Sequence, residues 1–213
     1  MNTSVLERAG AQIPASVAIV DTVAELSAIR DTGCAAAIMK RDPIAVLHAW
    51  LNTLAPDCLP EARLILRPDA VQKTVEQICD ACGTPQGLAR QILAHDIAEL
   101  ARNFARLMNV THIRLRLDVV TTNACRKFHI DALTARLICT YRGQTTQLGE
   151  ATPDGEPDSI FSVPQGCPVI LRGTQWKDDT PTSLKHRSPP IEGSGETRLL
   201  LVMDPIYDLD EEV

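Results

Sequence analysis

The sequence predicts an α+β protein in which a mainly helical N-terminal portion, residues 1–108, packs on a β-rich portion, residues 109–213. Two observations predict this division. In the first portion apolar residues recur at intervals of three and four, as on one face of a helix, whereas in the second they alternate with polar residues in short runs. At 213 residues the chain can bury a sizeable core, so we expect both portions to form one compact unit.

Two shorter helices are expected after an apolar run, 16–20, that could form an edge strand. Asp42-Pro43 is typical of a helix start, and the apolar stripe that follows should end before Pro56. A second helix should start at Arg67-Pro68-Asp69 and end before Gly83, because glycine commonly follows the last turn of a helix.

The longest helix is expected from about Gln86 to Met108. One face of this segment is broadly apolar and the other is charged. A long amphipathic helix directly before a strand-rich segment should lie along a sheet and bury one of its faces. The charged residues that we assign to the outer side are Arg90, Glu99, Arg102 and Arg106.

Alternation begins after Asn109. Residues 112–119 place Ile113, Leu115 and Leu117 on one face and charged residues on the other, which is typical of a half-buried antiparallel strand. Turns rich in Gly, Pro, Asp and Thr separate the strands that follow. Short strands at this spacing are typical of a β-sandwich or jelly roll. The further strands are expected over residues 128–131, 137–141, 160–163, 169–172, 182–186 and 198–203.

Composition excludes several classes of partner. The formal net charge of -6 argues against a general affinity for nucleic acid or for anionic membranes, since both require a basic surface. No apolar run has the length that spans a bilayer, and the N-terminus does not resemble a signal peptide. Seven cysteines, an odd number, fit reduced thiols better than a disulfide framework. We therefore expect a cytoplasmic protein with no nucleic-acid or membrane partner; the sequence leaves its oligomeric state open.

A candidate metal site is formed by His129, Asp131 and His186. Residues two apart on a strand project from the same face, so His129 and Asp131 can present an imidazole and a carboxylate to one ion. His186 stands just ahead of another apolar strand and is the candidate third ligand. Two histidines and one carboxylate on one face of an octahedron leave three positions open, which is the arrangement of non-haem iron(II) oxygenases.

Three segments resemble a bacterial family that has been catalogued only as a domain of unknown function: Cys125 to Asp131, Arg136 to Gly143, and His186 to Pro190. The resemblance covers most of the chain and is densest from Cys125 onward. It departs at Gln144 to Leu148, where a turn of the Gly-Pro-Gly-Thr type is expected. Genes of this family tend to lie beside zinc-limitation genes, so the resemblance implies a link to metal supply.

At a coarser level the β-rich portion is similar to the 2-oxoglutarate-dependent dioxygenases, especially the prolyl hydroxylase type. This resemblance implies a cupin-like double-stranded β-helix, iron(II) held by His129, Asp131 and His186 as the catalytic centre, and 2-oxoglutarate as cosubstrate. Arg198, twelve residues after His186, matches the arginine that binds the distal carboxylate of 2-oxoglutarate. Arginine suits this role because its bidentate guanidinium stays charged. Tyr141 matches a residue whose hydroxyl often reaches the cosubstrate.

The resemblance thus implies hydroxylation of an unidentified small-molecule or peptide substrate. The alternative is a non-enzymatic, cupin-like protein that binds zinc or another divalent ion in metal homeostasis. Arg126, Arg142 and Arg187 are candidates for substrate binding, although they, like Arg136 near the same site, could equally be structural ion-pair partners.

The cysteines carry two further expectations. Cys79 and Cys82 could form a redox pair or half of a zinc site, but a single Cys-x-x-Cys at a helix end is more often structural. Cys125, Cys139 and Cys167 lie near the motifs of the β-rich portion, at positions typical of packed strands or turns. We predict that none of these three thiols is a metal ligand.

Overall fold

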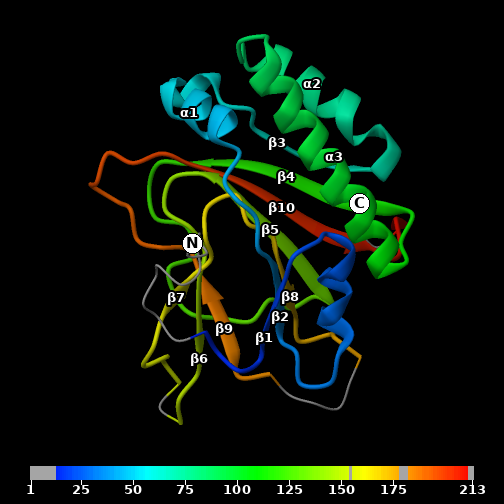
Figure 1. Ribbon diagram of the computed structural model, residues 1–213, viewed down its shortest axis with the longest axis vertical. Helices are drawn as coiled ribbons and strands as arrows, with labels where there is room; N and C mark the ends of the chain where they lie inside the picture. The colour runs from blue at the N-terminus through cyan, green and yellow to red at the C-terminus, as the bar shows by residue number, and fades with distance from the viewer. Residues whose placement is uncertain (1–12, 154, 178–181, 211–213) are drawn as a thin grey trace.

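The computed structural model describes residues 13–153, 155–177 and 182–210. The described residues form a large sheet with α-helices on one face and a small sheet against the other (Figure 1). The large sheet has the strand order β1-β2-β8-β5-β10-β4-β3 and is antiparallel except for the pair β1 and β2. Its strands are β1 Val17–Val20, β2 Ala36–Met39, β3 Ala62–Leu66, β4 His112–Val120, β5 Ala135–Arg142, β8 Val169–Arg172 and β10 Arg198–Ile206.

The small sheet has the order β7-β6-β9 and consists of β6 Gln147–Glu150, β7 Phe161–Ser162 and β9 Leu184–Arg187. A single bridge between His129 and His186 adds one more chain segment beside β9. From β4 onward the chain passes repeatedly between the two sheets, which is jelly-roll connectivity. Two sheets of mainly antiparallel strands are therefore present, as expected for the β-rich portion.

The three predicted helices are confirmed as α1 Ala45–Thr53, α2 Val71–Ala81 and α3 Leu88–Met108. α3 ends at Asn109, whose left-handed conformation (φ 54°) stops the helix where the periodicity changes. Its buried side chains, such as Ile97 and Phe104, share a core with Leu115 and Leu201 of the large sheet. The prediction that the long helix covers a face of the sheet is confirmed. Shorter 3-10 helices cover Ala24–Arg30, Pro56–Cys58 and Pro68–Ala70.

Arg90 does not lie on the outer side of α3, so that assignment is wrong. Its side chain is buried and donates hydrogen bonds to the carbonyl of Glu76 at 2.6 Å and to the carboxylate of Asp80 at 2.7 Å. Both partners belong to α2, which covers this turn of α3. Periodicity within one helix cannot reveal such a neighbour, so Arg90 was misplaced.

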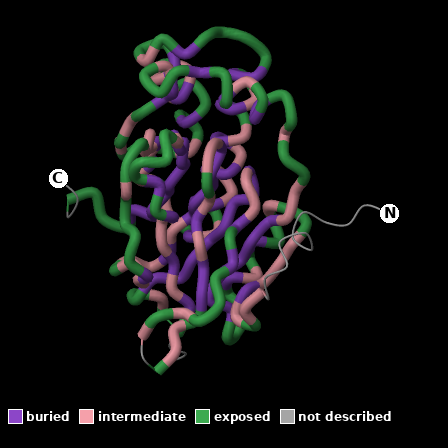
Figure 2. Tube along the Cα trace, turned by 90° about the vertical axis from the view of Figure 1, so that its left-hand side faces the viewer, coloured by how far each residue is buried: buried purple, intermediate pink, exposed green. Residues whose placement is uncertain are grey.

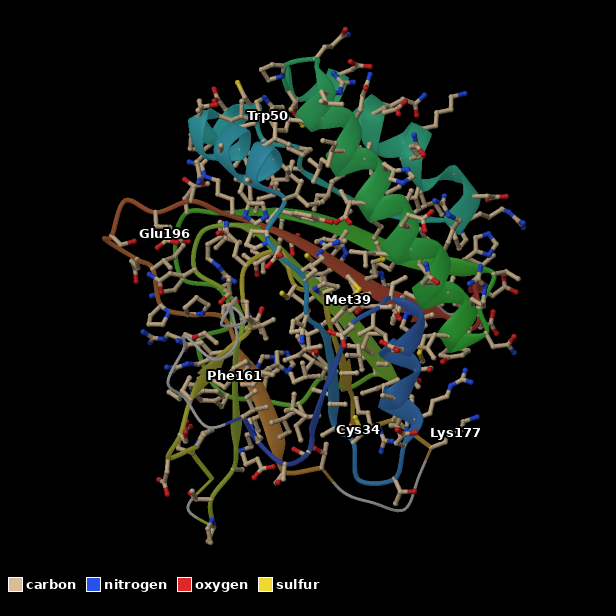
Figure 3. All side chains as sticks on the ribbon, in the orientation of Figure 1. Cys34, Met39, Trp50, Phe161, Lys177 and Glu196 are labelled. Atoms are coloured by element: carbon tan, nitrogen blue, oxygen red, sulfur yellow. The ribbon has the colours of Figure 1, made fainter. Side chains whose placement is uncertain are left out.

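Alternation along the strands of the large sheet separates two cores. One set of side chains faces the helices, and the other faces the small sheet in a second core that includes Ile138, Leu200 and Val202. Phe161 of the small sheet is buried in this second core (Figure 3). Figure 2 shows the buried residues concentrated along the strands in the middle of the molecule.

Several expectations for the strands need correction. Residues 128–131 do not form a strand but take part in the single bridge at His129. The expected edge strand over residues 16–20 is present as β1, at one edge of the large sheet, but β2 and β3, in the portion expected to be mainly helical, and β6 were not predicted. These strands are too short for a clear period. No helix of the described residues is long and apolar enough to cross a membrane.

Candidate metal centre

The bridge between His129 and His186 brings the two predicted histidine ligands together. His129 donates its backbone N–H to the carbonyl of His186 at 3.0 Å, and His186 donates back to His129 at 2.9 Å. Residues directly opposite one another on neighbouring strands carry their side chains on the same face. The two imidazole centroids are accordingly 4.4 Å apart.

Asp131 is held by an arginine that also crosses to β10. Nη1 of Arg136 donates to Oδ1 of Asp131 at 2.6 Å. The same guanidinium binds both carboxylate oxygens of Asp204, through Nε at 2.6 Å and Nη2 at 2.9 Å. With Oδ1 occupied in this way, Oδ2 lies 3.2 Å from Nε2 of His186.

The turn after β8 fixes the backbone of the segment that carries Asp131. Thr174 donates its N–H to the Asp131 carbonyl at 2.9 Å. A Cβ atom at Gly173 would lie 1.9 Å from the carbonyl oxygen of Leu133 and 2.8 Å from that of Asp131. Only glycine lets the two chain segments approach this closely.

Among the described residues, His129, Asp131 and His186 are the one group that could hold a metal ion, with ligand atoms within 4.8 Å of one another. Nδ1 of His129 lies 2.8 Å from the carbonyl oxygen of Lys127. A carbonyl can only accept, so Nδ1 carries the proton and Nε2 is free to bind a metal. The donor set of two imidazoles and one carboxylate fits both iron(II) and zinc and leaves coordination positions open.

The charge state of Asp131 suits a metal ligand. Burial alone would raise the pKa of its carboxyl group, but the hydrogen bond and charge of His186, together with Arg136 and His129, hold the pKa below its usual value. Oδ2 is buried and, apart from the contact with Nε2 of His186 at 3.2 Å, has no partner among the described residues. An ionised oxygen in that position is costly unless a cation binds it.

A pocket of about 140 Å³ opens next to the triad. His129 and His186 line it from the small-sheet side, and Leu200 and Val202 line it from β10. The side chain of His129 is 35% exposed, so one side of the site faces solvent. The exposed Cys125 also lines the pocket but is not part of the metal-binding group.

Arg198 lies next to residues that line this pocket. It is fully buried, two residues before Leu200 on β10 and paired with Val120 of β4, and both of those neighbours line the pocket. Nε donates to the carbonyl of Gln144 at 2.6 Å. Nη1 and Nη2 have no hydrogen-bond partner among the described residues. Burial lowers the pKa of Arg198 to about 10, and only Glu196 opposes this effect.

Gly143 makes room for this arginine. A Cβ atom at Gly143, which has φ 81°, would lie 2.9 Å from Cγ of Arg198 and 2.8 Å from the carbonyl oxygen of Thr197. Glu196, labelled in Figure 3, accepts a hydrogen bond from the Gln144 side chain at 2.9 Å. The turn after β5 and the loop before β10 therefore position Arg198 together.

Tyr141 lies on the wrong face of the sheet to bind a cosubstrate, so that prediction is wrong. It is fully buried in the core beneath the helices, and its hydroxyl donates to Oδ2 of Asp96 on α3 at 2.5 Å. Arg41 binds the same carboxylate at 2.5 and 2.8 Å. Burial raises the pKa of Tyr141 well above its usual value, so the hydroxyl remains a donor in this network. Cys139 is buried on the same side.

Arg142 also points to the helices and not to substrate. Its Nη1 donates to the carbonyls of Leu51 and Leu54, at 3.0 and 2.8 Å, at the end of α1. The register of β5 against β10 shifts between Leu199 and Leu200. This bulge interrupts the alternation, so Arg142 leaves the pocket face on which simple alternation would place it.

The other two candidates for substrate binding differ in position. Arg126 is exposed and does not line the pocket. Arg187 does line it, with its guanidinium 4.5 Å from the ring of Phe128 and Nε donating to the side chain of Gln147 at 2.8 Å.

The family model described as "Protein of unknown function (DUF1826)" matches residues 20–204. The chain belongs to this family. Comparison with curated proteins gave no match. The matched residues include all three segments on which the resemblance to a domain of unknown function is based.

Solved structures show the fold of this DUF1826 chain. It resembles a rice dioxygenase for auxin oxidation at 14% identity and a TM-score of 0.51, covering 91% of this chain and 84% of that one. It also resembles the Arabidopsis thaliana dioxygenase for auxin oxidation 1 in a binary complex with 2-oxoglutarate, at 11% identity and a TM-score of 0.52, covering 91% and 94%. The fold is therefore similar to the double-stranded β-helix of 2-oxoglutarate oxygenases.

Sequence reasoning missed three pocket residues of this DUF1826 chain. Arg136 was considered only as one of several arginines near the site. Its position five residues after Asp131, at the start of the next strand, was a signal that the two side chains could meet. Arg116 and Thr146 also line the pocket. Arg116 could have been found, because alternation in β4 places its side chain on the opposite face of the strand from Leu115 and Leu117. Thr146 has no comparable signal.

Cys79 and Cys82 lie at the end of α2, remote from the triad in the fold. Both thiols are free, and neither belongs to a metal-binding group of the described residues. Burial raises the pKa of Cys79. A buried thiol with a raised pKa is a weak nucleophile, which favours the structural interpretation of this pair.

Proposed function

We propose that this protein is an iron(II)- and 2-oxoglutarate-dependent dioxygenase that hydroxylates a small-molecule or peptide substrate. The observation that carries the proposal is Arg198, a buried guanidinium whose terminal nitrogens have no hydrogen-bond partner in the part of the chain that the structure describes. A buried, unpaired charge is strongly unfavourable, so such an arginine is expected to receive an anionic ligand.

The triad would hold the metal. His129 and His186 would each supply one imidazole nitrogen, and Asp131 would supply Oδ2, which Arg136 leaves free by binding Oδ1. Iron(II) bound there would supply the activation of oxygen that couples decarboxylation of 2-oxoglutarate to oxidation of the substrate. The strands from β4 to β10 would act as the double-stranded β-helix that encloses this centre.

The cosubstrate would extend from the metal to Arg198. Leu200 and Val202 line the pocket, and Arg198 precedes Leu200 by two residues in an unshifted register against β4, so all three share one face of β10. Each step of two residues advances the strand by roughly 7 Å. A dicarboxylate could therefore chelate the metal at one end and meet the buried guanidinium at the other. Thr146, which is buried and lines the pocket, is a better candidate than Tyr141 for a supporting hydroxyl. The apolar Leu200 and Val202 would exclude water between the two ends.

The alternative is a zinc-binding protein without enzymatic activity. The same three ligands suit zinc, since one class of protein zinc site uses two histidines and one carboxylate. A metal store needs no buried arginine beyond its site. Arg198 therefore favours the enzyme over the metal store.

Metal analysis of variants tests the triad. His129→Ala, Asp131→Ala and His186→Ala should each sharply reduce bound metal while the far-UV circular dichroism stays unchanged, because the two cores do not depend on them. Cys125→Ser is the matched control, since this thiol lines the same pocket outside the ligand group. Undiminished metal in all three triad variants, or loss of metal in the control, would overturn the ligand assignment.

A further inference from the structure

The metal pocket is also lined by two arginines that the proposed reaction does not use. We call the part of the lining formed by Arg116, Asp118, Cys125, Arg187 and Ser188 the mouth of the pocket. Arg116 projects from β4 and Arg187 from β9, so they reach the same pocket from opposite sheets. Ser188 and Cys125, the neighbouring lining residues, carry no fixed charge. The charge of this mouth is therefore set by the two guanidinium groups and by Asp118.

Arg116 is only loosely paired. Its Nη1 lies 3.8 Å from Oδ2 of Asp118, and its Nη2 lies 4.0 Å from Oδ2 of Asp204, both too far for a hydrogen bond. Its Nε is buried and has no hydrogen-bond partner among the described residues. Asp204 is already bound through both oxygens by Arg136. Arg116 is therefore only weakly compensated by the protein.

Arg187 is held in place without a carboxylate. The Phe128 ring, 4.5 Å from its guanidinium carbon, and the Gln147 side chain fix its orientation. Both contacts are made with neutral groups, and no ion pair joins Arg187 to any residue that the structure describes. An arginine fixed by stacking and one hydrogen bond loses little entropy when it binds an anion.

The charges of the site indicate how much negative charge the mouth can accept. With the proposed metal and cosubstrate bound, the divalent ion and Arg198 would balance Asp131 and the two carboxylates of 2-oxoglutarate. Arg136 and Asp204 balance each other. Arg116 and Arg187 then face Asp118 alone, which leaves one positive charge at the mouth.

We infer that the primary substrate presents a single carboxylate to Arg116 and Arg187 at the mouth of the metal pocket. This inference rests on the proposed function and names the substrate class of the same site. The carboxylate would be anchored by the paired guanidinium groups while the carbon to be oxidised points inward to the triad. Either a small carboxylic acid or an acidic side chain of a peptide has this chemistry.

Two matched pairs of probes test the inference on metal-loaded protein held without oxygen. N-acetylglycine and its amide differ only in a terminal charge, and the peptides acetyl-Ala-Glu-Ala-amide and acetyl-Ala-Gln-Ala-amide differ only in a side-chain charge. The affinities are measured by calorimetric titration in the presence of 2-oxoglutarate. In at least one pair, the acid should bind about ten times more tightly than its neutral partner, or tighter still. The pair that shows the preference identifies the source of the carboxylate.

Variants assign the preference to the two arginines. Arg116→Gln and Arg187→Gln should each reduce it to about threefold or less, and Arg63→Ala, an exposed arginine outside the pocket, should leave it unchanged. Thermal unfolding and far-UV circular dichroism check that the Gln variants fold. Equal affinity for acid and amide in both pairs, or a preference that survives in both Gln variants, overturns the inference.

Titration with 2-oxoglutarate separates the inference from the proposed function. Both Gln variants should retain the wild-type affinity for 2-oxoglutarate. A loss in Arg116→Gln as large as that in a variant of Arg198 would mean that the mouth binds the cosubstrate, and would overturn the inference. If wild type binds no 2-oxoglutarate, the proposed function fails; a preference for acid over amide on metal-loaded protein alone would still support the paired arginines as a carboxylate site.

Discussion

Replacing Arg198 with Met should stabilise the ligand-free protein and at the same time abolish its affinity for 2-oxoglutarate. Burial lowers the pKa of Arg198 from 12.5 to about 10, and each pKa unit corresponds to about 1.4 kcal/mol. The charged group therefore costs about 3 kcal/mol in the ligand-free fold. Loss of the hydrogen bond from Nε to Gln144 offsets about 1 kcal/mol of this gain. The net stabilisation is about 2 kcal/mol, which for a chain of this size raises Tm by about 4–8 °C.

The ligand should reverse the order of stability. At a concentration of 2-oxoglutarate about 100 times its Kd, metal-loaded wild type should gain about 2.7 kcal/mol, whereas Arg198→Met should gain almost nothing. Removing one partner of a buried ion pair costs about 3–5 kcal/mol, so the affinity should fall at least a hundredfold. Thermal unfolding with and without 2-oxoglutarate measures both effects.

Arg142→Met is the matched control. Arg142 lies on the neighbouring strand, but its guanidinium is satisfied by the carbonyls of Leu51 and Leu54. Its replacement should lower stability by about 1–3 kcal/mol, because two buried carbonyls lose their donor, and should leave the affinity for 2-oxoglutarate unchanged. The reasoning is refuted if Arg198→Met lowers Tm as Arg142→Met does and still binds 2-oxoglutarate.

Three other perturbations test the site and its support. Arg136→Ala removes the hydrogen bond to Asp131 and should weaken metal binding about 10–100-fold, measured by competition with a chelator; unchanged affinity would show that the arginine does not orient the ligand. Burial raises the pKa of Tyr141, so the folded state keeps a proton that the unfolded chain releases near pH 10. Above about pH 10 the wild type should therefore lose more stability than Tyr141→Phe, as measured by urea unfolding. An equal loss in both proteins would contradict this. Gly173→Ala places a methyl group 1.9 Å from the Leu133 carbonyl oxygen and should lower Tm and metal content together, whereas a wild-type Tm would contradict the close approach of the two segments.

The sequence was sufficient to predict those features that depend on local pattern. The period of α3, its end at Asn109 and the alternation of β4 are visible in the order of apolar residues alone. The proximity of two candidate metal ligands was predictable for a related reason, since His129 and Asp131 lie two residues apart. Strand-like spacing was a useful guide even though residues 128–131 form only a bridge.

The remaining features depend on pairing between distant segments. The β-bulge opposite Leu199 and Leu200 decides that Arg142 faces the helices, and a bulge has no sequence signal of its own. Tyr141 follows Cys139 and Leu137 onto the helix face, but that face could be assigned only once the position of α3 over the sheet was known. Arg136 acquires its role because β5 and β10 bring Asp204 beside it.

An anaerobic titration of iron-loaded protein with 2-oxoglutarate, followed by succinate detection on admission of air, tests the central claim most directly. A keto acid that chelates iron(II) through the open positions of the triad should produce a visible metal-to-ligand charge-transfer band, and the titration should saturate at one equivalent per iron. Succinate should then form in wild type but not in His186→Ala. Absence of the band together with absence of any 2-oxoglutarate affinity would contradict the oxygenase assignment and favour the zinc-binding alternative.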